Sequence, residues 1–114
     1  MTSYDLSGTA AWTALRDEHA TLAATNLREL FAADPTRGER LTADAGELHL
    51  DFSKNLVTDS TISALVALAD EAGLQAKIDA MFAGEHINVT EDRAVLHTAL
   101  RLPRDAKLDR KSVV

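Results

Sequence analysis

The stretch Thr58 to Gly73, TDSTISALVALADEAG, decides the fold class, because its apolar residues recur at the spacing of an α-helix. Thr58 is a suitable N-cap, and Gly73 is a natural stop. One side of the predicted helix carries the residues that we expect to be buried, namely Ile62, Leu65, Val66 and Ala69. The stretch therefore predicts an amphipathic helix.

Two further helices are predicted after Gly73. A short helix ends at Gly84 and has its apolar side at Leu74, Ile78, Met81 and Phe82. The last helix runs from Thr90 to about Leu102, where Pro103 terminates it.

Three basic side chains of this last helix form the most suggestive cluster of the chain. Arg93, His97 and Arg101 are spaced four apart, so we expect them on one helix face. Two guanidinium groups beside an imidazole suit a phosphate or a carboxylate. The same line also suits ion pairs with acidic residues of this chain or of a neighbouring domain, and we adopt that structural interpretation.

Upstream of Thr58 the sequence predicts three more helices. The first is capped by Thr9 and carries an apolar stripe that includes His19, which we therefore interpret as a packed, hydrogen-bonded histidine. The second begins at Asn26, with Glu29 in a capping-box position, and stops near Asp34-Pro35. A short third helix, with Asp34 as cap and Pro35 in its first turn, leads towards Leu41.

A change of period marks a β-hairpin between these two groups of helices. Apolar and polar residues alternate over 47–52, which predicts a half-buried strand with His49 pointing away from the core. The partner strand is expected at Leu41 to Ala43, with a turn at Asp44-Ala45-Gly46. The predicted fold is therefore mainly α with a small β-hairpin.

Charge and composition exclude several classes of function. Asp and Glu number 18 against 12 Lys and Arg, and the net charge of −6 argues against nucleic acids and anionic membranes as partners. There is no cysteine, hence no disulfide or thiolate chemistry. The sequence shows neither a secretory signal nor an apolar run of roughly 20 residues. We expect a cytoplasmic protein.

We expect no catalytic, substrate-binding, cofactor-binding or metal-binding residue in this chain. The histidines include no pair at metal-ligand spacing; they are His19, His49, His86 and His97. Adjacent carboxylates do not face a common point and are interpreted as solvated helix ends; they lie at Asp17-Glu18, Asp70-Glu71 and Glu91-Asp92. The sequence has no nucleophile elbow and no glycine loop suited to a phosphate.

A long motif nevertheless connects the chain to a known family. The stretch Met81 to Arg101, MFAGEHINVTEDRAVLHTALR, resembles the glucose-6-phosphate isomerase (phosphoglucose isomerase) family, whose pattern is MF-x-G-x-x-IN-x-TE-x-RAVLH-x-ALR. His86 stands where many relatives have Lys. Upstream, LRELF at 27–31 with Asp34-Pro35, and DFSKN at 51–55 with Thr58, resemble further family segments, with Phe52 for the usual Tyr. The matching residues of the motif are Met81, Phe82, Gly84, Ile87, Asn88, Thr90, Glu91, Arg93, Ala94, Val95, Leu96, His97, Ala99, Leu100 and Arg101.

The resemblance implies an aldose–ketose isomerase of carbohydrate metabolism, which interconverts glucose 6-phosphate and fructose 6-phosphate in glycolysis and gluconeogenesis. In that family a glutamate moves a proton between C1 and C2 through a cis-enediol, and no cofactor is needed. The family enzyme is an α/β protein with two sugar-isomerase domains, each an αβα sandwich, and is usually a homodimer.

None of the family's catalytic or phosphate-binding positions maps onto this sequence. We therefore expect residues 1–114 to be the N-terminal helical segment of such an isomerase, a fragment inactive alone. Its partners would be the downstream sugar-isomerase domains, absent from this chain, and the sugar phosphate and second subunit of the complete enzyme. The alternative is a free-standing helical interaction or regulatory module derived from the isomerase. A third possibility is a small anion or metal binder that uses Arg93, His97 and Arg101.

Overall fold

The computed structural model describes residues 5–106. These residues form two compact units, 5–68 and 69–106, and each unit is described by itself. Helices predominate, and the described residues contain one sheet of two antiparallel strands. The prediction of a mainly α fold with a small β-hairpin is confirmed.

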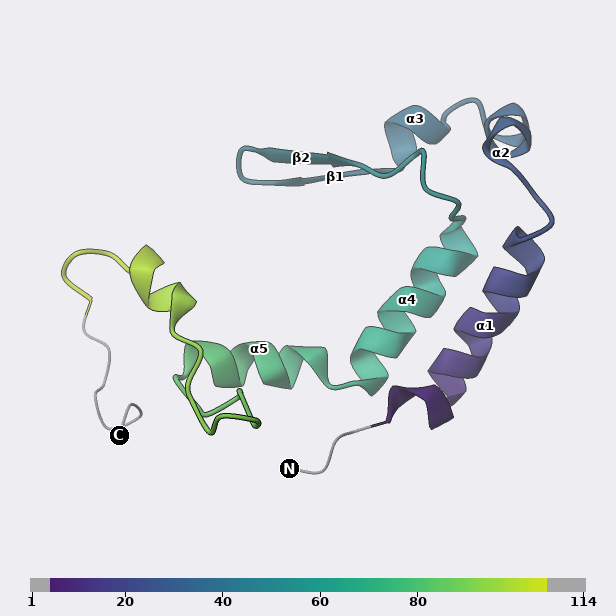
Figure 1. The fold of residues 1–114 in the computed structure, drawn as a ribbon. Helices are drawn as coiled ribbons and strands as arrows, with labels where there is room; N and C mark the ends of the chain where they lie inside the picture. Colours follow the sequence, from purple (N-terminus) through teal and green to yellow (C-terminus); the bar gives the residue numbers. More distant parts are fainter. Residues whose placement is uncertain (1–4, 107–114) are drawn as a thin grey trace. The chain divides into compact units, whose positions relative to one another are not determined.

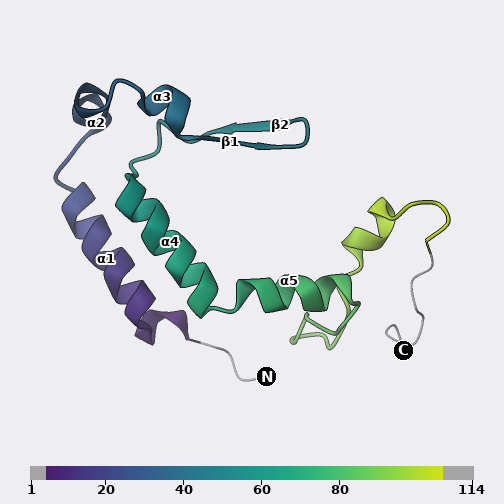
Figure 2. The same ribbon diagram turned by 180° about the vertical axis from the view of Figure 1, so that it is seen from behind.

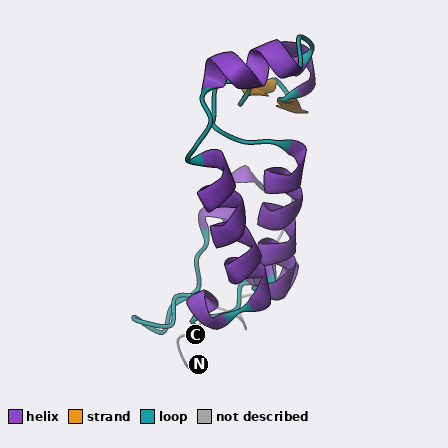
Figure 3. Cartoon of the chain, turned by 90° about the vertical axis from the view of Figure 1, so that its right-hand side faces the viewer, coloured by secondary structure: helices purple, strands orange, loops and turns teal. Residues whose placement is uncertain are grey.

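The first unit contains most of the regular structure. Helices α1 and α4 run side by side, and the short helices and the hairpin lie beyond their ends (Figures 1 and 3). In chain order the elements are η1 (Leu6–Gly8), α1 (Ala10–Leu22), α2 (Leu27–Ala33), α3 (Arg37–Arg40), β1 (Thr42–Ala45), β2 (Leu48–Asp51) and α4 (Asp59–Glu71), whose last turn belongs to the second unit.

Two helix starts lie where the capping residues predict them. The Thr9 hydroxyl accepts a hydrogen bond from the Trp12 amide at 3.1 Å, at the start of α1. The Asn26 side chain accepts one from the Glu29 amide at 3.0 Å, at the start of α2. Because each cap satisfies an amide that the first helical turn leaves free, it fixes where the helix begins.

Removing the Thr9 cap of α1 should destabilise the fold by a measurable amount. We expect Thr9→Ala to lower the free energy of unfolding by about 1 kcal/mol, because the Trp12 amide loses its acceptor. Urea-induced unfolding followed by circular dichroism measures this change. Thr21→Ala is the matched control, since Thr21 is an exposed residue near the other end of α1. An equal loss in both variants would contradict the capping role.

The short helix α3 begins later than predicted. Its N-cap is Thr36, which makes no capping hydrogen bond through its side chain. Asp34 instead accepts hydrogen bonds from the amide and the hydroxyl of Thr36, at 3.0 and 2.6 Å. The predicted start at Asp34-Pro35 is wrong because Asp34 closes this local turn before the helix begins.

The hairpin is confirmed, but its turn and its burial differ from the prediction. Ala45 pairs with Leu48, so the turn contains Gly46 and Glu47, and Gly46 has a φ of 61°. A two-residue turn with a positive φ suits glycine and an antiparallel ribbon. All four residues of β2 are exposed, so the prediction of a half-buried strand is wrong. Figures 1 and 2 show the ribbon projecting from α3.

The apolar core of the described residues is small. Only Leu22, at 7% exposure, and Leu41, at 3%, are buried aliphatic side chains in this part of the chain. The predicted buried face of α4 is wrong, because Leu65 is 41% exposed and Val66 is 55% exposed. The residue of α4 that is buried is the polar Thr61. Helical periodicity therefore predicts which residues share a face, but the described residues leave Leu65 and Val66 of that face exposed.

The second unit contains α5 (Leu74–Phe82) and the 3-10 helix η2 (His97–Arg101). The predicted stops at Gly73 and Gly84 are confirmed, since both glycines have a positive φ, 68° and 76°. A left-handed residue ends a helix, and glycine adopts that conformation without a steric penalty.

The predicted last helix from Thr90 to Leu102 is wrong. An isolated antiparallel bridge pairs Asn88 with Arg93, and only 97–101 form a helical turn, of the 3-10 type. The Asn88 side chain accepts a hydrogen bond from the Glu91 amide at 3.3 Å, and Asp92 has a φ of 50°. These local polar contacts compete with helix formation, and a short helix without a packed face is marginal.

No helix among residues 5–106 combines the length and the apolar character needed to span a bilayer.

Candidate functional site

The most specific side-chain arrangement of the first unit surrounds Arg37, which is 3% exposed. Its guanidinium donates hydrogen bonds to three backbone carbonyls. Nε lies 2.8 Å from the oxygen of Ser53, Nη2 lies 2.6 Å from that of Asn55, and Nη1 lies 2.8 Å from that of Val57. Because a guanidinium presents its donors in a rigid fork, one side chain fixes the whole path of the loop over 53–57. We call this arrangement the Arg37 clamp.

Two neighbours complete the clamp. The ring of Phe31 on α2 lies 5.6 Å from the guanidinium carbon, within the range of a cation–π contact. Ser53 is only 2% exposed, and its amide donates to the Asp51 carboxylate at 2.9 Å. Hydrogen bonding from the side chain and the amide of Ser53 lowers the pKa of Asp51. The clamp therefore joins α2, α3, the end of β2 and the loop before α4.

No motif or spacing in the sequence marks Arg37 as a functional residue. Its acceptors lie 16 to 20 residues further along the chain, and they are main-chain carbonyls that every residue carries. Only the preceding helix stop at Asp34-Pro35 indicates that the chain reverses here.

Glu18 connects α1 to α4. Its two carboxylate oxygens accept hydrogen bonds from the hydroxyls of Ser60, at 2.8 Å, and Thr61, at 3.1 Å. Glu18 thus faces the first turn of α4, where a carboxylate also interacts favourably with the helix dipole. The interpretation of the Asp17-Glu18 pair as solvated is wrong for Glu18, whose partners lie more than 40 residues away.

A pair of ionic contacts lies at the surface near α3. The Arg40 guanidinium bonds Asp34, with Nη2 2.6 Å from the carboxylate, and also bonds Asp59 at the start of α4. Hydrogen bonds from Thr36 first, and then from Arg40, lower the pKa of Asp34 from 3.8 to about 2. Because these groups are exposed, we assign them only a modest contribution to stability.

Asp34 predicts a specific dependence of stability on pH. A carboxyl group whose pKa is lowered by folding stabilises the fold above its unfolded pKa of 3.8, and this contribution is lost as the pH falls towards about 2. The difference in thermal midpoint between the parent chain and Asp34→Asn should therefore shrink over this range. Asp17→Asn, at an exposed carboxylate of α1, is the control. A difference that stays constant with pH would contradict the assignment.

An apolar groove of about 740 Å³ lies within the first unit. Trp12 and Leu15 of α1 line it, together with Leu56 of the loop before α4 and Thr61 of α4. The remaining lining residues are Arg16, His19, Ala20, Leu22 and Ala23. Its lining offers no pair of carboxylates and no oxyanion site, so the groove suits an apolar partner rather than acid–base chemistry.

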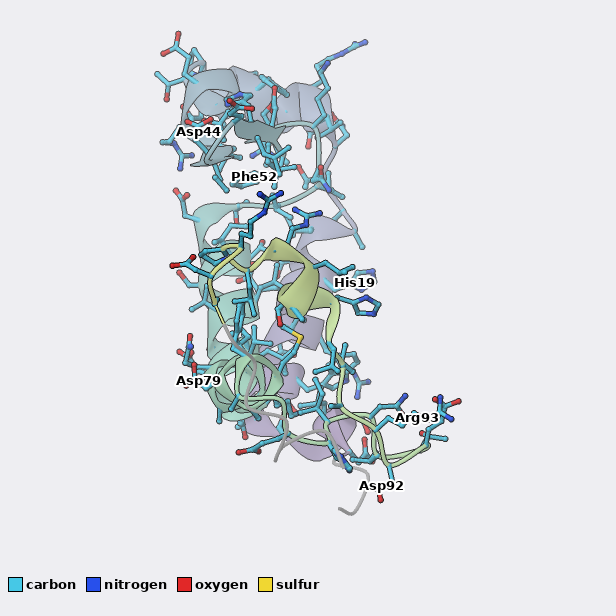
Figure 4. The ribbon with its side chains drawn as sticks, turned by 90° about the vertical axis from the view of Figure 1, so that its left-hand side faces the viewer. His19, Asp44, Phe52, Asp79, Asp92 and Arg93 are labelled. Carbon is cyan, nitrogen blue, oxygen red and sulfur yellow. The ribbon has the colours of Figure 1, made fainter. Side chains whose placement is uncertain are left out.

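The structure does not bring the predicted basic line together. Arg93 lies at the end of the bridged turn, where its Nη1 is 3.9 Å from the Glu91 carboxylate. His97 begins η2, and Arg101 ends it. Because 88–93 is a turn and not the first part of a helix, the spacing of four no longer places Arg93, His97 and Arg101 on one face. Figure 4 shows Asp92 and Arg93 on this turn.

The other histidines also lack a shared site. His19 is exposed on α1 and projects from the ribbon (Figure 4), so the interpretation as a packed residue is wrong. His49 points to solvent as predicted, and its Nδ1 lies 2.6 Å from the Asp44 carboxylate. His86 Nδ1 lies 3.0 Å from Asp92. In the described range, no group of three or more potential ligands lies close enough to hold a metal ion.

Comparison with known proteins identifies the family. The family model described as phosphoglucose isomerase matches residues 51–114, which is more than half of the chain. The chain belongs to the phosphoglucose isomerase family. The Arg37 clamp holds the Ser53 and Asn55 carbonyls at the start of this family region, and Arg37 itself precedes the region.

Curated relatives of the phosphoglucose isomerase family match nearly the whole chain. Glucose-6-phosphate isomerase 1 of Rhodococcus jostii is 58% identical over 106 residues, which are 93% of this chain and 19% of the relative. The glucose-6-phosphate isomerase of Mycolicibacterium smegmatis is 59% identical, again over 93% of this chain and 19% of the relative. That of Deinococcus radiodurans is 57% identical over 96% of this chain and 20% of its own length. The chain thus spans about a fifth of the length of these relatives.

Proposed function

We propose that residues 1–114 act as the N-terminal helical segment of a glucose-6-phosphate isomerase, an enzyme that interconverts glucose 6-phosphate and fructose 6-phosphate. The observation that supports this proposal is the 58% identity to a relative of that name over 93% of the chain. In this proposal the segment is structural, and the proton transfer and the phosphate binding belong to the sugar-isomerase domains that follow. The substrate is a sugar phosphate, no cofactor takes part, and the enzyme is a cytoplasmic homodimer.

The exposed apolar surface of the segment is consistent with this role. Large hydrophobic side chains lie exposed on elements of both units, for example Leu65 at 41%, Phe82 at 63% and Leu100 at 84%. Contiguous exposed apolar surface marks an interaction site, and the exposed Leu65 and Val66 are adjacent on α4. The segment therefore has surfaces that the remainder of an isomerase would cover.

A complementation assay tests the proposal. The segment is produced alone, the Rhodococcus jostii relative is produced without its matching part, and a coupled assay follows the formation of glucose 6-phosphate from fructose 6-phosphate. We expect no activity from either piece and activity from the mixture. A chimera that carries this segment in place of the matching part of the relative should be fully active, and an inactive, folded chimera would contradict the proposal.

The competing function is a free-standing interaction or regulatory module. Helix caps and stops inside the chain, at Thr9, Asn26, Gly73 and Gly84, are the observation in its favour. It predicts a monomer that unfolds cooperatively and gives no complementation. The isomerase proposal predicts instead a self-associating segment until its complement is added.

A further inference from the structure

The β1/β2 ribbon has two chemically different faces. Residues that pair across an antiparallel ribbon lie on the same face, and successive residues of a strand alternate. One face is therefore polar and carries Thr42, Asp44, His49 and Asp51. The other face is aliphatic and carries Ala43, Ala45, Leu48 and Leu50. We call this aliphatic set the ribbon face.

The polar face is satisfied by contacts within the chain. His49 pairs with Asp44 at 2.6 Å, and Asp51 accepts the Ser53 amide at 2.9 Å. The ribbon face, in contrast, is open, with Leu48 77% exposed and Leu50 61% exposed. A two-stranded ribbon is marginal in water unless one of its faces packs against another element. The ribbon face is thus the surface at which this ribbon gains stability.

The base of the ribbon is rigidly held. The Phe52 amide donates to the Leu41 carbonyl at 3.0 Å, and the Leu41 side chain is 3% exposed. Immediately after β2, the Arg37 clamp fixes the carbonyls of Ser53 and Asn55. The ribbon is therefore presented in a fixed direction from α3 (Figure 1), and little conformational freedom remains to be lost on docking.

We propose that the ribbon face is a docking surface for the part of the isomerase chain that follows this segment in its relatives. The inference rests on the proposed function. Because the segment corresponds to only 19% of the Rhodococcus jostii relative, most of that enzyme's polypeptide is available as the occupant. Docking within one chain needs little area, since the covalent link supplies a high effective concentration.

A second copy of this chain fits the ribbon face poorly. The ribbon carries Asp44, Glu47 and Asp51 and has no Lys or Arg over 42–51, so two such ribbons would repel each other. The area is also too small, since each partner in a standard protein interface buries about 800 Å², far more than two Leu and two Ala side chains offer. The receiving surface is instead an apolar patch bordered by Lys or Arg side chains.

Cysteine labelling of the chimera described above tests the proposal. Leu48→Cys and His49→Cys change neighbours that the ribbon directs to opposite faces. Trypsin cleavage after Arg40 and Lys54 isolates the ribbon in one peptide, so mass spectrometry reads its labelling regardless of cysteines elsewhere. The rate at which each thiol is labelled in the native state is divided by its labelling rate in urea, so that the two positions are compared on one scale. On this scale we expect the thiol of the Leu48→Cys variant to react at least about ten-fold more slowly than that of the His49→Cys variant.

Each other outcome overturns the proposal. Equal reactivity of the two variants, in chimeras that retain their activity, means that the ribbon face is open to solvent. Protection of the Leu48→Cys thiol that appears only at high protein concentration means that a second copy is the occupant.

A measurement without substitutions guards against variants that misfold. Hydroxyl-radical oxidation of Leu48, Leu50 and His49 is read in the same peptide of the unmodified chimera, and the extent in the native state is again divided by that in urea. We expect this ratio to be low at both leucines and high at the histidine. Similar ratios at all three positions overturn the proposal. Activity and protection test the two proposals separately. An inactive chimera with protected leucines would contradict the proposed isomerase function and support the docking surface, whereas an active chimera with exposed leucines would do the reverse.

Discussion

Replacing Arg37 by Met is expected to lower the free energy of unfolding of the segment by about 3 kcal/mol or more. The guanidinium is 3% exposed and donates to three carbonyls, at Ser53, Asn55 and Val57. Hydrogen bonds that involve a charged group contribute about 1.5–3 kcal/mol each, and the buried carbonyl of Ser53 loses its donor without gaining water in return. Urea-induced unfolding, followed by the fluorescence of Trp12, measures the change.

The same variant has a local consequence that trypsin detects. Lys54 lies between two of the clamped carbonyls, and cleavage after it requires the loop to open. When opening and closing are fast, the cleavage rate follows the population of the open loop. Since about 1.4 kcal/mol corresponds to a factor of ten, the loss of the clamp should accelerate cleavage at Lys54 by about a hundred-fold.

Two control variants separate the fork geometry from charge and from size. Arg37→Lys keeps the charge but cannot reach three carbonyls in one plane, so most of the loss should remain. Arg28→Met removes an exposed arginine from α2 and should change the free energy of unfolding by no more than about 0.5 kcal/mol. Stability in Arg37→Lys equal to that of the parent chain would show that the charge alone matters.

Local signals predicted four of the helix ends correctly. The caps at Thr9 and Asn26 and the stops at Gly73 and Gly84 lie where the sequence places them. Each depends on one side-chain acceptor or on one positive φ within a few residues, so no distant partner is needed. The motif over 81–101 likewise predicted the family, which the match to 51–114 confirms.

Burial and the last helix were not predictable in the same way. A periodic pattern identifies the aliphatic side of α4, yet whether Val66 is buried depends on chain that packs against it. The pattern over 90–102 also suits a helix, but the Asn88 side chain and the left-handed Asp92 favour a turn when no packing supports the helix. Because that helix does not form, the predicted alignment of Arg93, His97 and Arg101 on one face does not occur either.

The second large effect is expected at Leu41, one of the two buried aliphatic residues of the described chain. Leu41→Ala should lower the free energy of unfolding of the segment by about 3 kcal/mol, since removing a buried Leu side chain costs its transfer free energy and leaves a cavity. Leu41 is only 3% exposed and lies at the base of the ribbon, where its carbonyl accepts the Phe52 amide. Urea-induced unfolding measures the loss.

Leu50 provides a control of the same residue type on the same ribbon. It is 61% exposed, so Leu50→Ala should change the stability of the segment by less than about 0.5 kcal/mol. In the chimera with the Rhodococcus jostii relative, its cost should rise to about 2 kcal/mol, because the ribbon face is then covered and the side chain is buried. Leu41→Ala should cost about the same in both proteins. A small effect of Leu50→Ala in both would mean that nothing covers the ribbon face, whereas a large effect in the segment alone would mean that the face is already packed there.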